Sequence, residues 1–189
     1  MRKFLISLAS IGMVFAIAVA PAAAAKGKAK KPDKTIVETV IDISGPSGFD
    51  DDHHDFDILR DAVVATGLAD KLGGKGQLTV FAPTDQAFLD LTGADSEQEA
   101  FDGVAALGLP AVKKVLKYHV SPGKRGAKQV VKKRKIPTLL KGESLSKSRG
   151  STTLVDATGR EVEIVVPNAA KASNGVIHVI DGVLLPFQP

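Results

Sequence analysis

The chain has 189 residues, a formal net charge of +4 and no cysteine. The missing cysteine excludes disulfides, thiolate metal sites and N-terminal lipid attachment, and the length suffices for one domain with its own core. The charge is segregated: residues 33–102 carry 16 acidic and 4 basic residues, whereas residues 113–149 carry 13 basic and one acidic. One interpretation is that the two halves face each other and neutralise their charges, or are solvated faces. The other is that the basic half binds an anionic polymer or a membrane surface.

The N-terminus has the pattern of a secretory signal. Arg2 and Lys3 precede the apolar residues 4–20, and small residues follow up to Ala25. We therefore predict a signal peptide over residues 1–25, cleaved near Ala25, with no retained transmembrane anchor. A flexible basic leader (residues 26–34) and one domain (residues 35–187) follow, so the mature protein is expected outside the cell or in the periplasm.

Capping signals and helical spacing dominate the first half of the domain. Thr35 and Glu38 can form a capping box before a short helix, although the next residues also fit a strand. Further helices are expected over residues 56–66, from Thr84 or Asp85, from Ser96 to about Gly108, and from Pro110 to about Val120. Residues 78–82 form a predicted strand that Pro83 ends.

The second half is typical of strands. Short runs at residues 129–131, 138–140, 151–155 and 161–166 are separated by glycine-containing turns, with a hairpin loop at 156–160. The closing segment, residues 174–186, is apolar at both strand parities, which favours a strand in the middle of the core where only His178 needs a polar partner. The order of elements predicts an α+β fold, with helices on one side of a mostly antiparallel sheet.

The densest group of possible metal ligands lies just before the second helix and contains Asp50, Asp52, His53, His54 and Asp55. Such residues can hold Ca²⁺ or a transition metal. The segment lacks the central glycine and the terminal glutamate of an EF-hand loop. The alternative is an acidic approach to a helix N-terminus, with Asp55 as the cap.

The sequence gives little support for catalysis. None of its serines stands in a Gly-x-Ser-x-Gly elbow, and the glycines at 73–76 are not followed by a phosphate-binding lysine and serine or threonine. His119 and His178 lie in apolar runs, where we expect a buried neutral imidazole with one donor and one acceptor contact. We therefore expect a protein that is not an enzyme and needs no cofactor, with Ca²⁺ as the alternative.

Three stretches together resemble the fasciclin domain: residues 79–88 (TVFAPTDQAF), residues 116–120 (LKYHV) with Pro122-Gly123, and residues 174–186 (NGVIHVIDGVLLP). Their order fits, and the resemblance spans about residues 35–186, as in single-domain secreted proteins of bacteria. It implies a wedge of about seven mostly antiparallel strands with several flanking helices, and a role in adhesion between cells or to extracellular matrix.

The resemblance also identifies motif residues, to which we assign structural roles. They are Thr84, Asp85, Tyr118, His119, Asn174, His178 and Asp181. In animal members of the family, integrin recognition has been placed around the Tyr-His pair and at an Asp-Ile pair before the closing block. Residues 168–173 (NAAKAS) lack that Asp-Ile pair.

The sequence thus favours a secreted, non-enzymatic adhesion module whose partner is a cell-surface protein, a matrix protein or an anionic polysaccharide. The predicted contact residues are Lys124, Arg125, Lys128, Lys132, Lys133, Arg134 and Lys135. Nucleic acid is disfavoured, because export separates the protein from it and the basic run has no interleaved aromatics. The alternative function is a Ca²⁺- or metal-dependent protein that uses residues 50–57. The sequence does not indicate an oligomeric state.

Overall fold

The computed structural model describes residues 32–45, 48–50 and 52–188, which belong to one compact unit. The predicted signal peptide and most of the predicted leader lie outside the described residues. Within these ranges, no helix combines the length and apolar character needed to cross a membrane.

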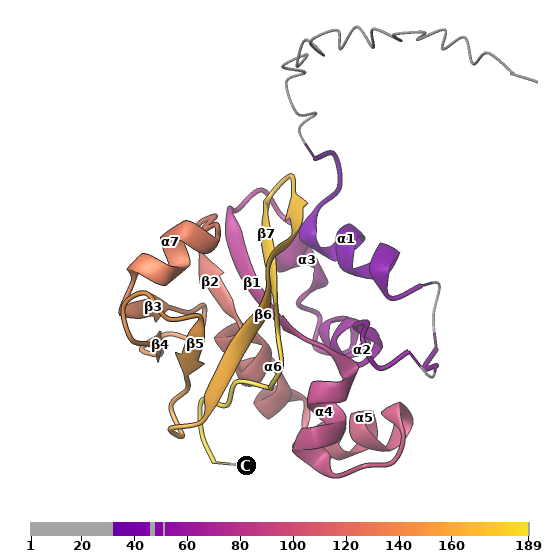
Figure 1. Ribbon diagram of the computed structural model, residues 1–189. Coiled ribbons are helices and arrows are strands. Elements are labelled where there is room, and N and C mark those ends of the chain that lie inside the picture. The colour runs from indigo at the N-terminus through magenta and orange to yellow at the C-terminus, as the bar shows by residue number, and fades with distance from the viewer. Residues whose placement is uncertain (1–31, 46–47, 51, 189) are drawn as a thin grey trace, which may run out of the picture. The chain divides into compact units, whose positions relative to one another are not determined.

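The described residues form seven helices and one seven-stranded sheet (Figure 1). The helices are α1 (Ile36–Ile43), α2 (Asp57–Ala65), α3 (Ala69–Gly73), α4 (Asp85–Thr92), α5 (Glu97–Ala105), α6 (Leu109–Tyr118) and α7 (Ala127–Lys132). The strands are β1 (Leu78–Pro83), β2 (Val120–Pro122), β3 (Lys135–Pro137), β4 (Ser144–Ser146), β5 (Thr153–Val155), β6 (Glu161–Ala172) and β7 (Gly175–Ile180). Their order is β2-β1-β7-β6-β5-β4-β3, and every neighbouring pair is antiparallel except β1 and β7. The predicted α+β class with a mostly antiparallel sheet is confirmed.

Strand β7 lies inside the sheet and is buried along its whole length. Ile177 and Val179 pack into the larger apolar cluster, to which α1, α2, α4, α5 and α6 contribute. Ile180 points to the other side and joins a second cluster with Phe81 and Tyr118. Covering both faces explains why this segment is apolar at both parities.

The sheet curls until its two edges approach each other. The backbone N–H of Leu139, just after β3, donates to the carbonyl oxygen of Val120 in β2 (2.7 Å). In Figure 1, α1, α2, α4 and α5 lie on one side of the unit, whereas α7 lies with β3, β4 and β5 on the other. The acidic helices and the basic α7 therefore lie on opposite sides of the unit.

Local signals predicted several elements correctly. Thr35 and Glu38 form the reciprocal capping box at the start of α1, so these residues are helical rather than a strand. Strands β5 and β6 form the expected hairpin. In its loop, one carboxylate oxygen of Asp156 accepts backbone N–H groups from Thr158 and Arg160.

The prediction of a strand at residues 129–131 is wrong, because these residues lie in α7. The β-branched pair Val130-Val131 resembles a strand, but only Val130 is buried. The backbone N–H of Ala127 donates to the side-chain oxygen of Asn168 on β6 (2.9 Å), which caps the first turn of α7. That contact joins residues 41 positions apart, so local pattern could not reveal it.

Other strand boundaries also differ from the prediction. The strand expected at 138–140 lies at 135–137. Thr138 instead begins the following turn, where its hydroxyl donates to the carbonyl oxygens of Leu140 and Glu143. Strands β2 and β4 were not predicted. Residues 183–185 are buried as expected but extend no strand.

Both core histidines are buried with both ring nitrogens engaged, as the sequence led us to expect. For His119, Nδ1–H donates to the Val115 carbonyl oxygen, and Nε2 accepts the N–H of Leu184 (both 2.9 Å). For His178, Nδ1 accepts the Asn168 N–H (3.1 Å) and Nε2–H donates to the Arg125 carbonyl oxygen (2.9 Å). Each neutral ring therefore ties separate chain segments together.

Asn174, at the start of β7, holds two helices against the sheet. Its side-chain oxygen accepts the N–H of Ile36 (2.9 Å), and its amide donates to the carbonyl oxygens of Leu72 and Gly74 (2.7 and 2.8 Å). The next residue must be glycine, because a Cβ at Gly175 would lie 2.4 Å from the backbone oxygen of Leu78.

We predict that Asn174→Ala lowers the free energy of unfolding by about 3 kcal/mol, because two buried and one partly buried hydrogen bond of about 1 kcal/mol each are lost. Denaturant titration measures this change. The control is Gln77→Ala, which removes one exposed 3.5 Å contact to the same region and should leave stability nearly unchanged. Equal effects of the two substitutions would contradict the assigned role of Asn174.

We also predict a pH dependence that originates at His119. Burial lowers its pKa from 6.5 to about 4, although the hydrogen bond to Val115 and the negative charge of Asp156 both act to raise it. Because the unfolded chain binds this proton more readily, the stabilisation is complete above pH 6.5 and is lost as the pH falls towards about 4. The loss from this group should be about 3 kcal/mol.

Urea unfolding of the wild type and of His119→Gln across this pH range measures the effect as a difference in slope. His54→Gln is the control, since that side chain is 90% exposed. Identical slopes for the wild type and His119→Gln would show that His119 does not titrate in this way.

Candidate functional site

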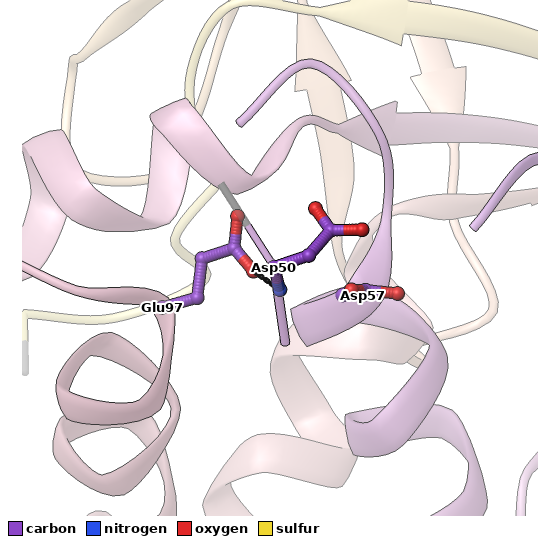
Figure 2. A group of neighbouring side chains, drawn as sticks. All are labelled: Asp50, Asp57 and Glu97. Carbon is purple, nitrogen blue, oxygen red and sulfur yellow. Dashed lines mark hydrogen bonds between the residues drawn. The ribbon is translucent and has the colours of Figure 1, made fainter. Parts of the chain in front are cut away.

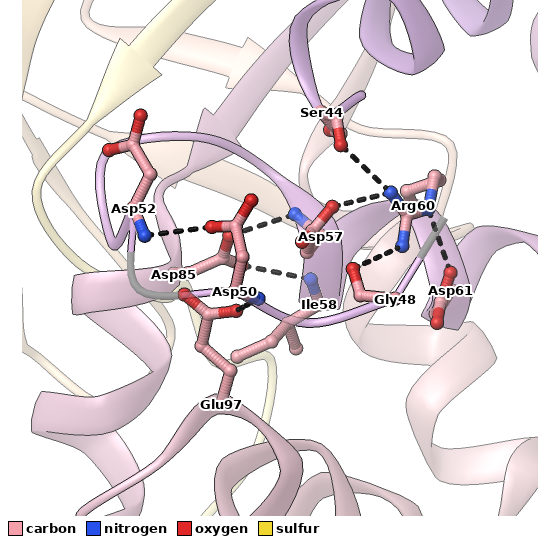
Figure 3. Close-up of polar contacts among 10 residues, drawn as sticks. All are labelled: Ser44, Gly48, Asp50, Asp52, Asp57, Ile58, Arg60, Asp61, Asp85 and Glu97. Carbon is pink, nitrogen blue, oxygen red and sulfur yellow. Dashed lines mark hydrogen bonds and ion pairs between the residues drawn. The ribbon is translucent and has the colours of Figure 1, made fainter. Parts of the chain in front are cut away.

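Three helices begin at one place, and each begins with a buried carboxylate: Asp57 in α2, Asp85 in α4 and Glu97 in α5 (Figure 3). Positive helix N-termini favour negative charge nearby, which is the local reason for acids at these positions. The loop before α2 adds Asp50 and Asp55. We call these five carboxylates the acidic junction.

Asp85 caps a helix that is distant in sequence. Its two carboxylate oxygens accept the backbone N–H groups of Asp57 (2.8 Å) and Ile58 (2.9 Å) at the start of α2. Asp55, the cap expected if this segment is an acidic approach to the helix, does not cap α2, so that prediction is wrong. The residue before α2, Phe56, offers no side-chain cap, and Asp85 supplies it from 28 residues further along the chain.

One buried guanidinium faces the acidic junction. Arg60 contacts one carboxylate oxygen of Asp57 and donates to the carbonyl oxygens of Ser44 (3.0 Å) and Gly48 (3.2 Å). It also pairs with Asp61. Arg60 thus contacts one carboxylate of the acidic junction and is shared with Asp61, which lies outside it.

Several oxygens of the acidic junction have no hydrogen-bond donor. Among the described residues, Asp55 Oδ1, Asp57 Oδ2 and Glu97 Oε1 are buried without a partner. The ligand atoms fall into two groups that share Glu97, one with Asp50 and Asp57 and one with Asp55 and Asp85. Within each group, all ligand atoms lie within 4.8 Å of one another.

Burial makes these acids harder to ionise. It raises the pKa values of Asp57, Asp85 and Glu97, and the neighbouring Asp55 carboxyl adds to the rise at Asp85 and, by its charge, at Asp57. A buried carboxylate without donors is costly, so such a group must gain a proton or a cation. The arrangement can therefore hold shared protons, a metal ion or both.

The predicted ligand cluster is only partly assembled. Asp50 and Asp55 belong to the two groups, whereas Asp52 contributes loop contacts instead. His54 is exposed, and His53 Nε2 lies 3.9 Å from Glu97 Oε1. The predicted segment, residues 50–57, included Asp57, but the sequence did not reveal Asp85 and Glu97 as its partners. The available signal was that Asp85 and Glu97 each follow a residue that can cap a helix, Thr84 and Ser96, which predicts both acids at helix starts.

The predicted contact residues form a second candidate site, on α7 and the strand after it. Lys128, Lys132, Lys133, Arg134 and Lys135 are exposed. We call these five the basic surface. Within the described part of the chain, no basic side chain of residues 113–149 forms an ion pair, so the two charged halves do not neutralise each other by direct pairing.

Two predicted contact residues have structural partners. Lys124 donates to the carbonyl oxygen of Ala172 (2.9 Å). Arg125 donates to the hydroxyl of Ser121 (2.8 Å) and to the carbonyl oxygen of Pro122. Together with Lys133, both line an open hollow of ≈ 300 Å³ beside α7.

The remaining family-motif residues lie mostly in the scaffold. Tyr118 is fully buried, its hydroxyl donates to the carbonyl oxygen of Ser144 (3.4 Å), and burial raises its pKa to about 12. Asp181 is exposed and accepts the N–H of Glu163 (2.8 Å). Thr84 precedes α4 without a side-chain capping bond.

Comparison with known protein families and sequences identifies relatives of the chain. The model of the Fasciclin domain matches residues 54–186. Protein sll1483 of Synechocystis is 39% identical over 137 residues, which cover 69% of this chain and 67% of that protein. Transforming growth factor-beta-induced protein ig-h3 of Sus scrofa is 33% identical over 137 residues, 69% of this chain but only 18% of that protein.

A solved structure agrees with the fold. The FAS1 domain pair from the insect cell adhesion molecule Fasciclin I superimposes with a TM-score of 0.59 at 19% identity, and the match covers 82% of this chain and 51% of that one. The expected resemblance is confirmed by the family model, by the relatives and by this fold. The chain belongs to the fasciclin domain family.

Proposed function

We propose that the protein is a secreted, non-enzymatic adhesion module that binds an anionic polysaccharide or matrix polymer through the basic surface. The observation that carries this proposal is the exposure of five cations on one short segment, without ion pairs in the described part of the chain. The finding that Fasciclin I is a cell adhesion molecule supports the adhesion class.

The geometry of the basic surface suits a linear polyanion. Helix α7 and strand β3 follow each other directly, so the cations of residues 128–135 lie on adjacent elements (Figure 1). The open hollow beside α7 offers room for an anionic group next to Lys124 and Lys133. Attraction over a surface of one charge sign accelerates the approach of an oppositely charged polymer.

The segment at residues 168–173, which lacks the Asp-Ile pair, has a structural role beside the basic surface. Asn168 takes a left-handed backbone conformation (φ 56°) within an irregular part of β6. Its side chain caps α7, and its N–H contacts His178. This segment supports the helix that carries the basic surface.

The buried histidines support a non-enzymatic role. Both ring nitrogens of His119 and of His178 are used by the backbone, so neither ring can accept a proton from a substrate without breaking a structural contact. His54, the exposed histidine of the acidic loop, lies beside Asp52, with its Nδ1 3.7 Å from a carboxylate oxygen.

We predict that the protein binds dextran sulfate and that binding weakens at least about tenfold when NaCl rises from about 0.02 M to about 0.3 M, because salt screens exposed charges. The double substitution Lys132→Glu and Lys133→Glu should weaken binding at low salt by a similar factor. Titration calorimetry or retention on an immobilised polymer measures both effects.

The matched control is Lys71→Glu with Lys75→Glu, which makes the same charge change at two exposed lysines of the acidic half. It should bind dextran sulfate nearly as the wild type does. Salt-independent retention, or equal losses in the two double variants, would contradict the proposed surface.

A further inference from the structure

We propose a Ca²⁺ site formed by the carboxylates of Asp50, Asp57 and Glu97 at the acidic junction (Figure 2). This site is separate from the basic surface, and it does not depend on the proposed function. Its residues come from the loop before α2, the first turn of α2 and the first turn of α5. The ion would join these three segments.

The distances suit one shared ion. One ligand atom from each of the three carboxylates lies within 4.8 Å of the other two. Two oxygens on opposite sides of a Ca²⁺ ion are separated by about 4.8 Å, since each Ca–O distance is about 2.4 Å. Figure 2 shows the three side chains gathered at one place, with Asp50 between Glu97 and Asp57 in this view.

The unpartnered oxygens are an independent indication of a ligand. The side chains of Asp57 and Glu97 are each only 1% exposed. Asp57 uses Oδ1 to contact Arg60, and Glu97 uses Oε2 to accept the Asp50 N–H (3.1 Å). The second oxygen of each, Asp57 Oδ2 and Glu97 Oε1, has no hydrogen-bond partner among the described residues, and His53 Nε2 lies 3.9 Å from Glu97 Oε1.

The local charge balance also favours a divalent cation. Asp55 and Asp85 lie beside the same Glu97, and in the described part of the chain one guanidinium, that of Arg60, contacts Asp57 and is shared with Asp61. Burial raises the pKa of Asp85 to about 8, so a proton can balance that carboxyl while the others keep an excess of negative charge. Two additional positive charges would neutralise part of this excess. Asp50 is exposed, which gives the ion a route from solvent and leaves room for water ligands.

The donor set selects a hard cation. Both ligand groups contain carboxylate oxygens only, and oxygen ligands suit Ca²⁺ rather than Zn²⁺ or Cu²⁺. His53 approaches Glu97 but stays outside the group. Ca²⁺ also tolerates irregular geometry, whereas Mg²⁺ requires near-ideal octahedral ligands at about 2.0–2.1 Å.

In the test, the thermal unfolding midpoint of the chelator-treated wild-type protein is measured at a series of CaCl₂ concentrations up to about 10 mM. This upper limit exceeds the dissociation constants of weak extracellular Ca²⁺ sites, which reach about 1 mM. Binding to the folded state must raise the unfolding midpoint with concentration. MgCl₂ at equal concentration controls for ionic strength. Titration calorimetry gives the stoichiometry, which should be one ion per chain.

Two substitutions locate the ion. Glu97→Gln and Asp50→Asn should each weaken the apparent Ca²⁺ affinity by at least about tenfold, because each removes one charged ligand. Asp50 is exposed, so its variant should fold normally. Asp102→Asn is the matched control, since it removes an exposed acid from the same helix as Glu97 and should retain the wild-type shift.

Folding without Ca²⁺ provides a second readout. Glu97→Gln should be at least as stable as the wild type in chelator, because it removes a buried charge of which one oxygen, Oε1, has no hydrogen-bond donor. The proposal is overturned if the wild type shows no midpoint shift with Ca²⁺, if MgCl₂ gives the same shift, or if both ligand variants respond like Asp102→Asn.

Discussion

The rest of the structure depends on burying both faces of β7. A strand with apolar residues at both parities is stable only between two layers, and the chain supplies them as two apolar clusters. Its neighbours in the sheet are β1, which runs parallel to it, and β6, which runs antiparallel. Asn174 and His178, the polar side chains at its start and middle, are therefore fully hydrogen-bonded.

Because the core is occupied by scaffold residues, the residues available for binding lie on the charged exterior and at the helix ends. The family blocks fill the core: β1 and β7 supply the central strands, and Tyr118 and His119 sit beneath them. The basic surface and the acidic junction lie on different sides of the unit, on α7 with β3 and around the starts of α2, α4 and α5 (Figure 1). The cationic surface is therefore apart from the group of acids.

The sequence predicted what local pattern determines and missed what distant contacts determine. The Thr35 capping box, the β5–β6 hairpin and the burial of His178 follow from neighbouring residues. Helix α7 was mistaken for a strand because its cap, Asn168, comes from β6. The acidic junction was found only in part for the same reason: Asp85 and Glu97 approach Asp57 through the packing of three helices, which spacing along the chain cannot show.

Native-state hydrogen exchange, with and without dextran sulfate, tests most directly the claim that the family blocks are scaffold and the charged exterior is the contact surface. The account predicts that β7 amides exchange only through global unfolding and that the polymer leaves their relative protection unchanged, while it slows exchange in α7 and β3. Rapid exchange in β7, or polymer protection confined to residues 174–186, would contradict the account.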